Sequence, residues 1–150
     1  MNAIDILKKD HKEVESLFSE FMSADKDDFS GRADLFQQID RALIIHTDAE
    51  EQIFYPAAKK FSPDIVKRAL SEHHEIKELL VDLIDLEVDD PGFDNRMKTL
   101  IQRVQTHVQE EEGRGGVMEI AVQNLHTREL VDLGRRILQL KKESEEELAA

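Results

Sequence analysis

The pattern His-x-x-x-Glu occurs twice in this chain, at His46 and Glu50 and again at His107 and Glu111. Both copies lie in segments whose apolar residues recur every three or four positions, which is the spacing of an amphipathic helix. Residues four apart on a helix share one face, with their Cβ atoms roughly 5–6 Å apart. Each copy therefore places an imidazole and a carboxylate on the face that also carries core residues. The two copies together predict a metal site inside a helical bundle.

Apolar residues at helical spacing predict four main helices. The first begins after Asn2, a good N-cap residue, and the second follows the polar stretch 23–31. The third begins at Ser62-Pro63, an N-cap followed by a first-turn proline, and the fourth begins near Asp94. Connections of roughly 4–10 residues between such helices favour an all-α fold class, an up-down-up-down four-helix bundle.

Proline and glycine positions and the C-terminal segment complete the expected architecture. Pro56 is expected to end or kink the second helix, because proline removes a backbone hydrogen bond. Glycines within 113–116 end the fourth helix. The chain after Val117 predicts a short or broken helix and then an additional C-terminal helix packed outside the bundle. We expect one metal-binding domain over residues 1–143 and a charged, frayed tail over residues 144–150.

The charge and composition of the chain limit its partners. It has 20 basic and 33 acidic residues, a net charge of −13, which repels nucleic acid and anionic membrane, so we expect neither as a partner. It has no cysteine, which excludes disulfides and thiolate ligands. No apolar run approaches the roughly 18 residues that span a bilayer, and the N-terminal sequence lacks the order of a signal peptide. These features favour a cytoplasmic protein.

Histidines recur once in the apolar stripe of each predicted main helix, and the second and fourth helices add a glutamate. The set is His11, His46, Glu50, His73, His107 and Glu111. A single histidine on an apolar face is usually a core residue bonded to a neighbour. Four of them beside two buried carboxylates are harder to explain in that way, because an uncompensated buried carboxylate costs several kcal/mol. No Arg or Lys lies at a spacing that would neutralise both carboxylates, whereas a multivalent cation would.

The donor types limit the metal. Imidazole nitrogen mixed with carboxylate oxygen suits Fe, Mn or Zn and is too rich in nitrogen for Ca²⁺ or Mg²⁺. A structural zinc ion needs only four ligands. Six ligands, two of them carboxylates that can bridge, fit two metal ions roughly 3.5–4 Å apart. Six residues do not fill the coordination of two octahedral ions, so positions remain for water or a small molecule.

The order of these residues resembles the hemerythrin-like family of His-His-Glu cation-binding domains. The local contexts are also similar: Asp10-His11, Glu51-Gln52-Ile53-Phe54-Tyr55-Pro56 and Glu72-His73. The resemblance covers about residues 3 to 142. It implies a non-heme di-iron centre, two iron ions with an oxo or hydroxo bridge, with Mn or Zn as alternative metals. The ligands that it implies are His11, His46, Glu50, His73, His107 and Glu111, with both glutamates bridging.

This chain departs from the family pattern at two places. The invertebrate oxygen carriers of the superfamily have a histidine one turn after the third-helix ligand, where this chain has Lys77. One iron then has fewer imidazoles and is more open, which argues against a simple reversible oxygen carrier. After the fourth helix, Gly113-Arg114-Gly115-Gly116 stands where many relatives have an apolar-Phe-Pro segment. A flexible segment there could admit solvent or close over the site.

Several residues near these ligands have an alternative interpretation. His74 could replace His73, but the face of His74 is more polar, so His73 is preferred. Tyr55 is either a core aromatic whose hydroxyl bonds to the backbone, which is the favoured interpretation, or a group near the metals. Three acidic neighbours point about 100° around the helix from the ligands and are expected to be solvated: Glu51, Glu110 and Glu112. Glu110 could become a ligand if the helix end relaxes.

Two classes of function follow from this pattern. The first is a di-iron protein that binds or reacts with a small molecule (O₂, peroxide or NO) in sensing, iron handling or stress protection. The alternative is a non-catalytic cation-binding or iron-responsive interaction module. A two-metal hydrolase fits least well, because the sequence shows neither a positioned general base nor a basic pocket. The pattern leaves open whether the protein turns a substrate over, and it does not fix the oligomeric state.

Overall fold

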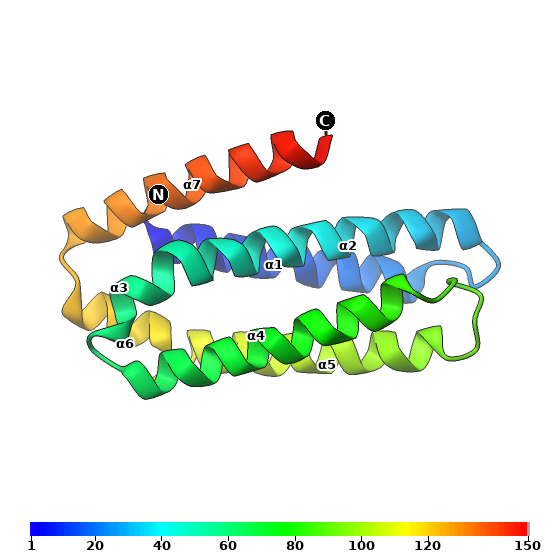
Figure 1. The fold of residues 1–150 in the computed structure, drawn as a ribbon, viewed down its shortest axis with the longest axis horizontal. Coiled ribbons are helices and arrows are strands. Elements are labelled where there is room, and N and C mark those ends of the chain that lie inside the picture. The colour runs from blue at the N-terminus through cyan, green and yellow to red at the C-terminus, as the bar shows by residue number, and fades with distance from the viewer. Residues whose placement is uncertain (150) are drawn as a thin grey trace.

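Long helices form an antiparallel bundle in the computed structural model, which describes residues 1–149 (Figure 1). There is no strand among these residues, and one long helix lies along the outside of the bundle. This confirms the predicted all-α bundle with an additional C-terminal helix. The elements in chain order are α1 (Ala3–Ser23), α2 (Phe29–Ala49), the π-helical turn η1 (Glu50–Phe54), α3 (Tyr55–Lys59), α4 (Pro63–Ile84), α5 (Phe93–Glu112), α6 (Val117–Asn124) and α7 (Thr127–Ala149).

Capping side chains fix where the first two helices begin. Helix α1 begins after a capping box, in which the Asn2 side chain accepts from the Asp5 N–H and the Asp5 carboxylate accepts from the Asn2 N–H. Helix α2 begins after Asp28, whose carboxylate accepts from the N–H of Gly31. Such caps satisfy donors that the first turn of a helix leaves without an intrahelical partner.

The bundle consists of four helical rods: α1, the continuous run of α2, η1 and α3, then α4, and α5. The second rod is continuous although it contains Pro56. The rod does not end there. It continues to Lys59 and bends between α2 and α3, which agrees with a kink (Figure 1). In η1 the N–H of Tyr55 donates to the carbonyl of Glu50, five residues earlier. Pro56 then occupies the first turn of α3, where a missing N–H costs little.

Two apolar clusters fill the two ends of the bundle. One includes Phe21, Ile39 and Met97, and the other includes Leu7 and Phe54. A polar layer lies between them, made of six side chains that are each no more than 7% exposed: His11, His46, Glu50, His73, His107 and Glu111. The fold therefore carries the six predicted ligands in its interior.

Helix α7 lies against α1 and α2 on the outside of the bundle (Figure 1). It continues to Ala149, so residues 144–149 of the predicted tail are helical, and most of them are exposed. Ala150, the last residue of that predicted tail, lies outside the described residues. Among residues 1–149, no helix combines the length and the apolar composition that crossing a bilayer requires.

Gly134 lets α7 approach the N-terminus of the chain closely. A Cβ atom at this position would lie 2.9 Å from the backbone N of Ala3 and 2.9 Å from the backbone C of Asn2. Backbone atoms cannot move aside as a flexible side chain can. The packing of α7 therefore depends on the absence of a side chain here.

A Gly134→Ala substitution tests this contact through the sign of its effect. Helix propensity alone would stabilise the variant by about 1 kcal/mol. The steric overlap should outweigh this gain and lower the free energy of unfolding by about 1–3 kcal/mol, as overpacking does. Denaturant titration of both proteins measures the difference. A stabilised variant would contradict the close approach of α7 to the N-terminus.

Candidate metal centre

Four histidines, one from each rod of the bundle, turn their Nε2 atoms toward one another. The Nε2 atoms of His11 on α1 and His46 on α2 are 3.1 Å apart. The Nε2 atoms of His73 on α4 and His107 on α5 are also 3.1 Å apart. The polar layer therefore holds two histidine pairs, each contributed by two neighbouring helices.

Glu50 lies between the two histidine pairs. Its Oε1 atom is 2.9 Å from Nε2 of His46 and 3.1 Å from Nε2 of His73. Its Oε2 atom has no hydrogen-bond partner among residues 1–149. Burial would raise the pKa of Glu50, but His46 and His73 outweigh burial and hold this pKa well below its usual value. Glu50 is therefore a buried carboxylate anion that contacts both pairs and keeps one oxygen free.

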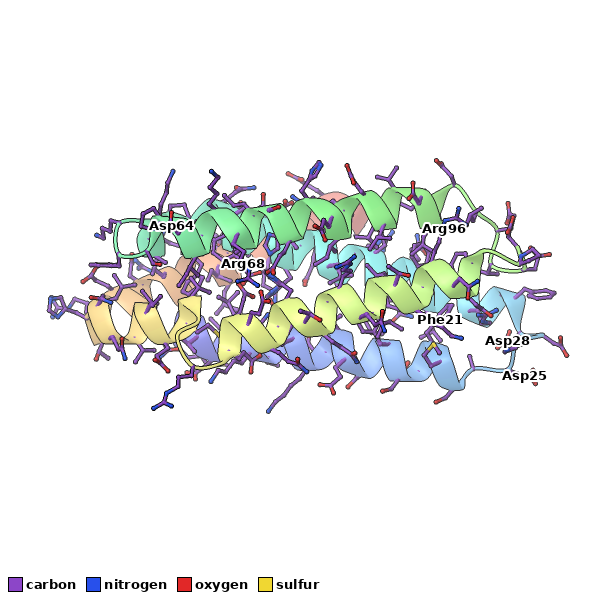
Figure 2. All side chains as sticks on the ribbon, turned by 90° about the horizontal axis from the view of Figure 1, so that it is seen from below. Phe21, Asp25, Asp28, Asp64, Arg68 and Arg96 are labelled. Carbon is purple, nitrogen blue, oxygen red and sulfur yellow. The ribbon has the colours of Figure 1, made fainter. Side chains whose placement is uncertain are left out.

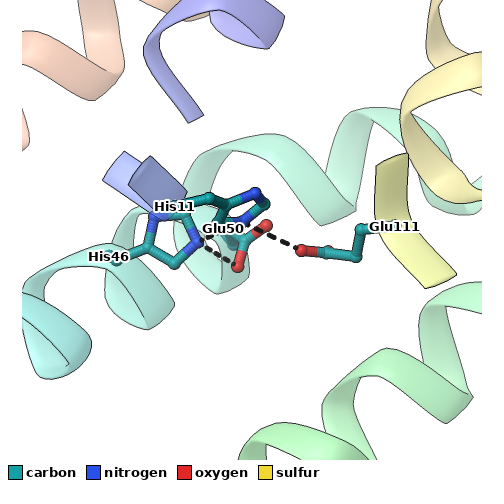
Figure 3. Close-up of side chains that lie close together, drawn as sticks. All are labelled: His11, His46, Glu50 and Glu111. Atoms are coloured by element: carbon teal, nitrogen blue, oxygen red, sulfur yellow. Dashed lines mark hydrogen bonds and ion pairs between the residues drawn. The ribbon is translucent and has the colours of Figure 1, made fainter. Parts of the chain in front are cut away.

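Glu111 occupies the corresponding place beside the other two histidines. Its Oε1 atom is 3.5 Å from Nε2 of His11 and 3.2 Å from Nε2 of His107. Figure 3 shows His11, His46 and both glutamates converging. Oε1 is close enough to both rings for electrostatic attraction, but it accepts no hydrogen bond from the described residues. Each glutamate thus contacts one histidine from each pair.

Tyr55 also reaches this cluster, so the favoured interpretation of a hydroxyl bonded to the backbone is wrong. The hydroxyl donates to Oε2 of Glu111 at 2.5 Å and lies 3.1 Å from Nε2 of His73. In a regular α-helix, Tyr55 would point about 140° away from Glu50. The π-helical turn makes its hydrogen bond between these two residues, five positions apart, and so brings them to one face.

A carboxylate holds the second ring nitrogen of each histidine. The Nδ1 atoms bond as follows: His11 to Glu112 at 2.6 Å, His46 to Asp10 at 2.9 Å, His73 to Glu51 at 2.8 Å and His107 to Glu72 at 2.7 Å. A carboxylate anion only accepts, so each Nδ1 atom carries the proton and donates. The lone pair of a neutral ring then lies on Nε2, facing the centre. Carboxylates orient metal-binding imidazoles in the same way.

These partners were only partly visible in the sequence. Glu51 and Glu112 remain partly exposed, with side chains that are 27% and 32% accessible, but each also bonds to a histidine on another helix, which was not predicted. No role for Asp10 or Glu72 was predicted from the sequence. The sequence does contain one indication of these partners, because each of the four acids is the direct neighbour of a residue of the polar layer. Each acid, however, bonds to a histidine on a different helix, and sequence spacing does not reveal that pairing.

The remaining alternative residues differ in where their side chains lie. His73 is 1% exposed, whereas the side chain of His74 is 74% exposed and pairs with Glu78. Glu110 stays at the surface, as expected, where its carboxylate accepts from Arg68 at 2.8 Å. Lys77, at the place of a histidine in the oxygen carriers, instead donates to Glu51 at 2.9 Å.

The donor set fits a multivalent cation. If the facing rings were neutral, each Nε2 pair would bring two lone pairs within 3.1 Å, so a proton or a cation is required between them. Ligand atoms fall into two groups whose members lie within 4.8 Å of one another, and both groups contain Glu50. The groups are His11, His46, Glu50 and Glu111, and Glu50, His73 and His107.

The chain matches the family described as Hemerythrin HHE cation binding domain over residues 2–114. This chain belongs to the hemerythrin HHE family. A DNA nickase from Nostoc sp. is 32% identical over 113 residues, covering 75% of this chain and 32% of the relative. This chain thus spans about a third of the length of that relative. A solved hemerythrin HHE cation binding domain-containing protein from Mycobacterium kansasii has a TM-score of 0.77 and 19% identity, covering 96% of this chain and 87% of that one.

A cavity of about 240 Å³ leads from the surface of the HHE domain to Glu111. It is lined by the start of α4, the end of α5 and the glycine segment, including Arg68, Glu72 and Gly116. Figure 2 shows Arg68 between α4 and α5. The glycine segment that follows α5 therefore lines the cavity that reaches Glu111.

Tyr55→Phe should destabilise the metal-free HHE domain. The change leaves Oε2 of Glu111 buried without its donor, and an unsatisfied buried acceptor costs about 1–3 kcal/mol. Denaturant titration of metal-free proteins measures this loss. An unchanged free energy of unfolding would show that the Tyr55 hydroxyl does not hold Glu111.

The stability of the metal-free domain should fall as the pH rises from about 6.5 to about 10. Burial lowers the pKa of His46, but Glu50 and Asp10 outweigh it and raise the pKa from 6.5 to about 10. In the same way, burial is outweighed by Glu111 and Glu72, which raise the pKa of His107 to about 11. In this range the folded protein holds protons that the unfolded chain has lost, so stability is present below pH 6.5 and is lost above it.

A metal ion should reverse this pH dependence, because it replaces those protons. The rise in melting temperature on adding Zn²⁺ should be larger at pH 8 than at pH 6. Scanning calorimetry at both values, with a metal-free control at each, measures the rise. An equal rise at both values would contradict the displacement of protons from these histidines.

Proposed function

We propose that this HHE domain holds two iron ions and uses them to bind or react with a small molecule, O₂, peroxide or NO. The proposed ligands are His11, His46, Glu50, His73, His107 and Glu111. The observation that carries the proposal is the pair of ligand groups that share Glu50. One histidine pair would hold each ion, and Glu50 and Glu111 would supply carboxylate oxygens, since each contacts one histidine of each pair.

The protein donors leave room for an exogenous ligand. Four imidazoles and two carboxylates are fewer donors than two octahedral ions require. Iron would supply the one-electron and O₂ chemistry that side chains lack. The residues of this chain do the rest: the carboxylates on Nδ1 fix the rings, and the bundle excludes bulk water. Mn and Zn remain alternative occupants by donor type, and Zn would not support redox chemistry.

The surroundings of the histidines favour a small, weakly polar ligand. A cavity of about 20 Å³ lies against all four rings and is otherwise lined mainly by apolar side chains, including Val14, Leu43 and Val104. This is room for about one water-sized molecule. Burial and the nearby carboxylates raise the pKa of Tyr55, so its hydroxyl stays protonated and keeps donating to Glu111. These features suit a diatomic molecule or peroxide.

The name of the Nostoc relative does not lead to a nucleic-acid function here. This chain corresponds to 32% of that protein, which leaves most of its length without a counterpart. A net charge of −13 also disfavours contact with a phosphate backbone. Nucleic acid and membrane therefore stay outside the proposal, and a cytoplasmic location stays a prediction.

A non-catalytic cation-binding module is the second candidate. The observation that favours it is the deep burial of the ligand groups, each no more than 7% exposed. In this case metal would stabilise the fold or report the iron level, and no small molecule would need to reach the centre.

Rapid mixing of the reduced, iron-loaded protein with O₂, H₂O₂ and NO distinguishes the two candidates. The proposal expects a change in the visible or near-ultraviolet absorption with at least one of these molecules. A protein that holds two iron ions and responds to none of them would be a cation-binding module. A protein that takes up no iron would contradict the proposal, and one that takes up no iron, manganese or zinc would contradict both candidates.

A His73→Ala substitution should reduce the iron content from two ions to one. It removes one of the two imidazoles at the second ligand group, which contains only Glu50, His73 and His107. His74→Ala is the matched control, because the neighbouring side chain is exposed and should leave two ions bound. Elemental analysis of both purified variants measures the stoichiometry. Equal iron loss in the two variants would contradict this assignment of ligands.

A further inference from the structure

Lys141 connects the outer helix α7 to the polar layer. Its Nζ atom donates to Oδ1 of Asp10, and the other oxygen of Asp10 accepts from Nδ1 of His46 at 2.9 Å. The family match ends at residue 114, whereas α7 begins at Thr127. A helix that lies outside the matched region thus reaches a proposed metal ligand through a single carboxylate.

The contact is unusually sheltered for a lysine. The side chain of Asp10 is 6% exposed and that of Lys141 is 20% exposed. The comparable cations, Lys77 beside Glu51 and Arg68 beside Glu72, have side chains that are 39% and 70% exposed. Ion pairs near the surface are screened by water and salt, so the Lys141 contact is the least screened of the three.

Lys141 and His46 hold the carboxylate of Asp10 from two sides. Its two oxygens have different partners, Lys141 on one side and His46 on the other. Removal of the lysine would leave one oxygen of a buried carboxylate without this partner, which favours rotation of the carboxylate toward water. His46 would then lose the acceptor that fixes its ring and keeps its proton on Nδ1.

We propose that α7, through Lys141, is a positioning element of the metal centre, so that metal occupancy and docking of α7 stabilise each other. This inference rests on the proposed function, because it requires a metal at His46. Coupling of this kind is reciprocal: if docking of α7 strengthens metal binding, then metal strengthens the docking of α7 by the same factor. Residues 142–149 are mostly exposed, so the coupling would make metal binding at the buried centre detectable at the surface of α7.

Three variants separate this role from general packing. Lys141→Met removes the donor and keeps an aliphatic side chain, and Lys141→Arg keeps a donor and a charge. Lys142→Met is the matched control, since Lys142 is the exposed neighbour on the same helix. Co²⁺ serves as the probe, because its visible absorption reports ligand geometry. Titration gives affinity and stoichiometry, and hydrogen exchange of α7 amides is measured with and without Co²⁺.

The proposal expects Lys141→Met to bind one of two Co²⁺ ions at least tenfold more weakly, with an altered visible spectrum. Lys141→Arg should restore much of both, and Lys142→Met should match the wild type. In the wild-type protein, Co²⁺ should slow exchange in α7, a result that needs no variant to fold. A purely structural role for Lys141 would change α7 exchange but leave the Co²⁺ spectrum unaltered.

Two results would overturn the inference and point to different causes. If the wild type binds two Co²⁺ ions and Lys141→Met binds them with unchanged affinity and spectrum, α7 does not position the centre and the proposed function survives. The same conclusion follows if Co²⁺ leaves α7 exchange unchanged in the wild type. If the wild type binds no Co²⁺, the proposed two-metal function and this inference fail together.

Discussion

The bonds between histidine Nδ1 atoms and carboxylates are the interactions on which the centre of this bundle depends. Each bond keeps the proton on the outer nitrogen and turns Nε2 inward. The result is a layer of buried charge between two apolar clusters, with facing nitrogens that need a proton or a cation between them. A bundle without this layer could pack more apolar surface. The polar layer is therefore better explained as a cation-binding site than as a feature that stabilises the fold.

Basic side chains form a further layer of charge outside the carboxylates that bond to the histidines. Lys77, Arg68 and Lys141 each contact one of the carboxylates that hold a histidine. The chain is strongly acidic overall, yet it places cations beside these particular anions. The charge near the centre thus alternates from imidazole to carboxylate to ammonium or guanidinium, and the outer members reach helix surfaces. Changes at the surface can in this way act on a centre that solvent hardly touches.

Much of this arrangement could be predicted from the sequence, and the rest depended on contacts between helices. The doubled His-x-x-x-Glu and the single histidines in the other two stripes identify the residues of the polar layer, because helical period alone sets which face a residue occupies. The partners of Nδ1 could not be assigned, since each lies on another helix. The position of Tyr55 could not be predicted from a uniform α-helical period, because the chain forms a wider turn over Glu50–Phe54.

That wider turn changes which residues of the second rod face the centre of the bundle. Before it, His46 and Glu50 face the centre at ordinary helical spacing, and after it Tyr55 faces the same centre although it is five residues further on. One rod can thus present two successive sets of polar groups to one point, which a uniform helix of this length would spread around its circumference. A deletion of one residue within the turn would leave Glu50 and Tyr55 four positions apart, the spacing at which residues of a uniform α-helix share one face, so α3 would keep its orientation relative to the bundle. The wider turn therefore accommodates one residue more than a uniform α-helix needs to bring Glu50 and the tyrosine to the same centre.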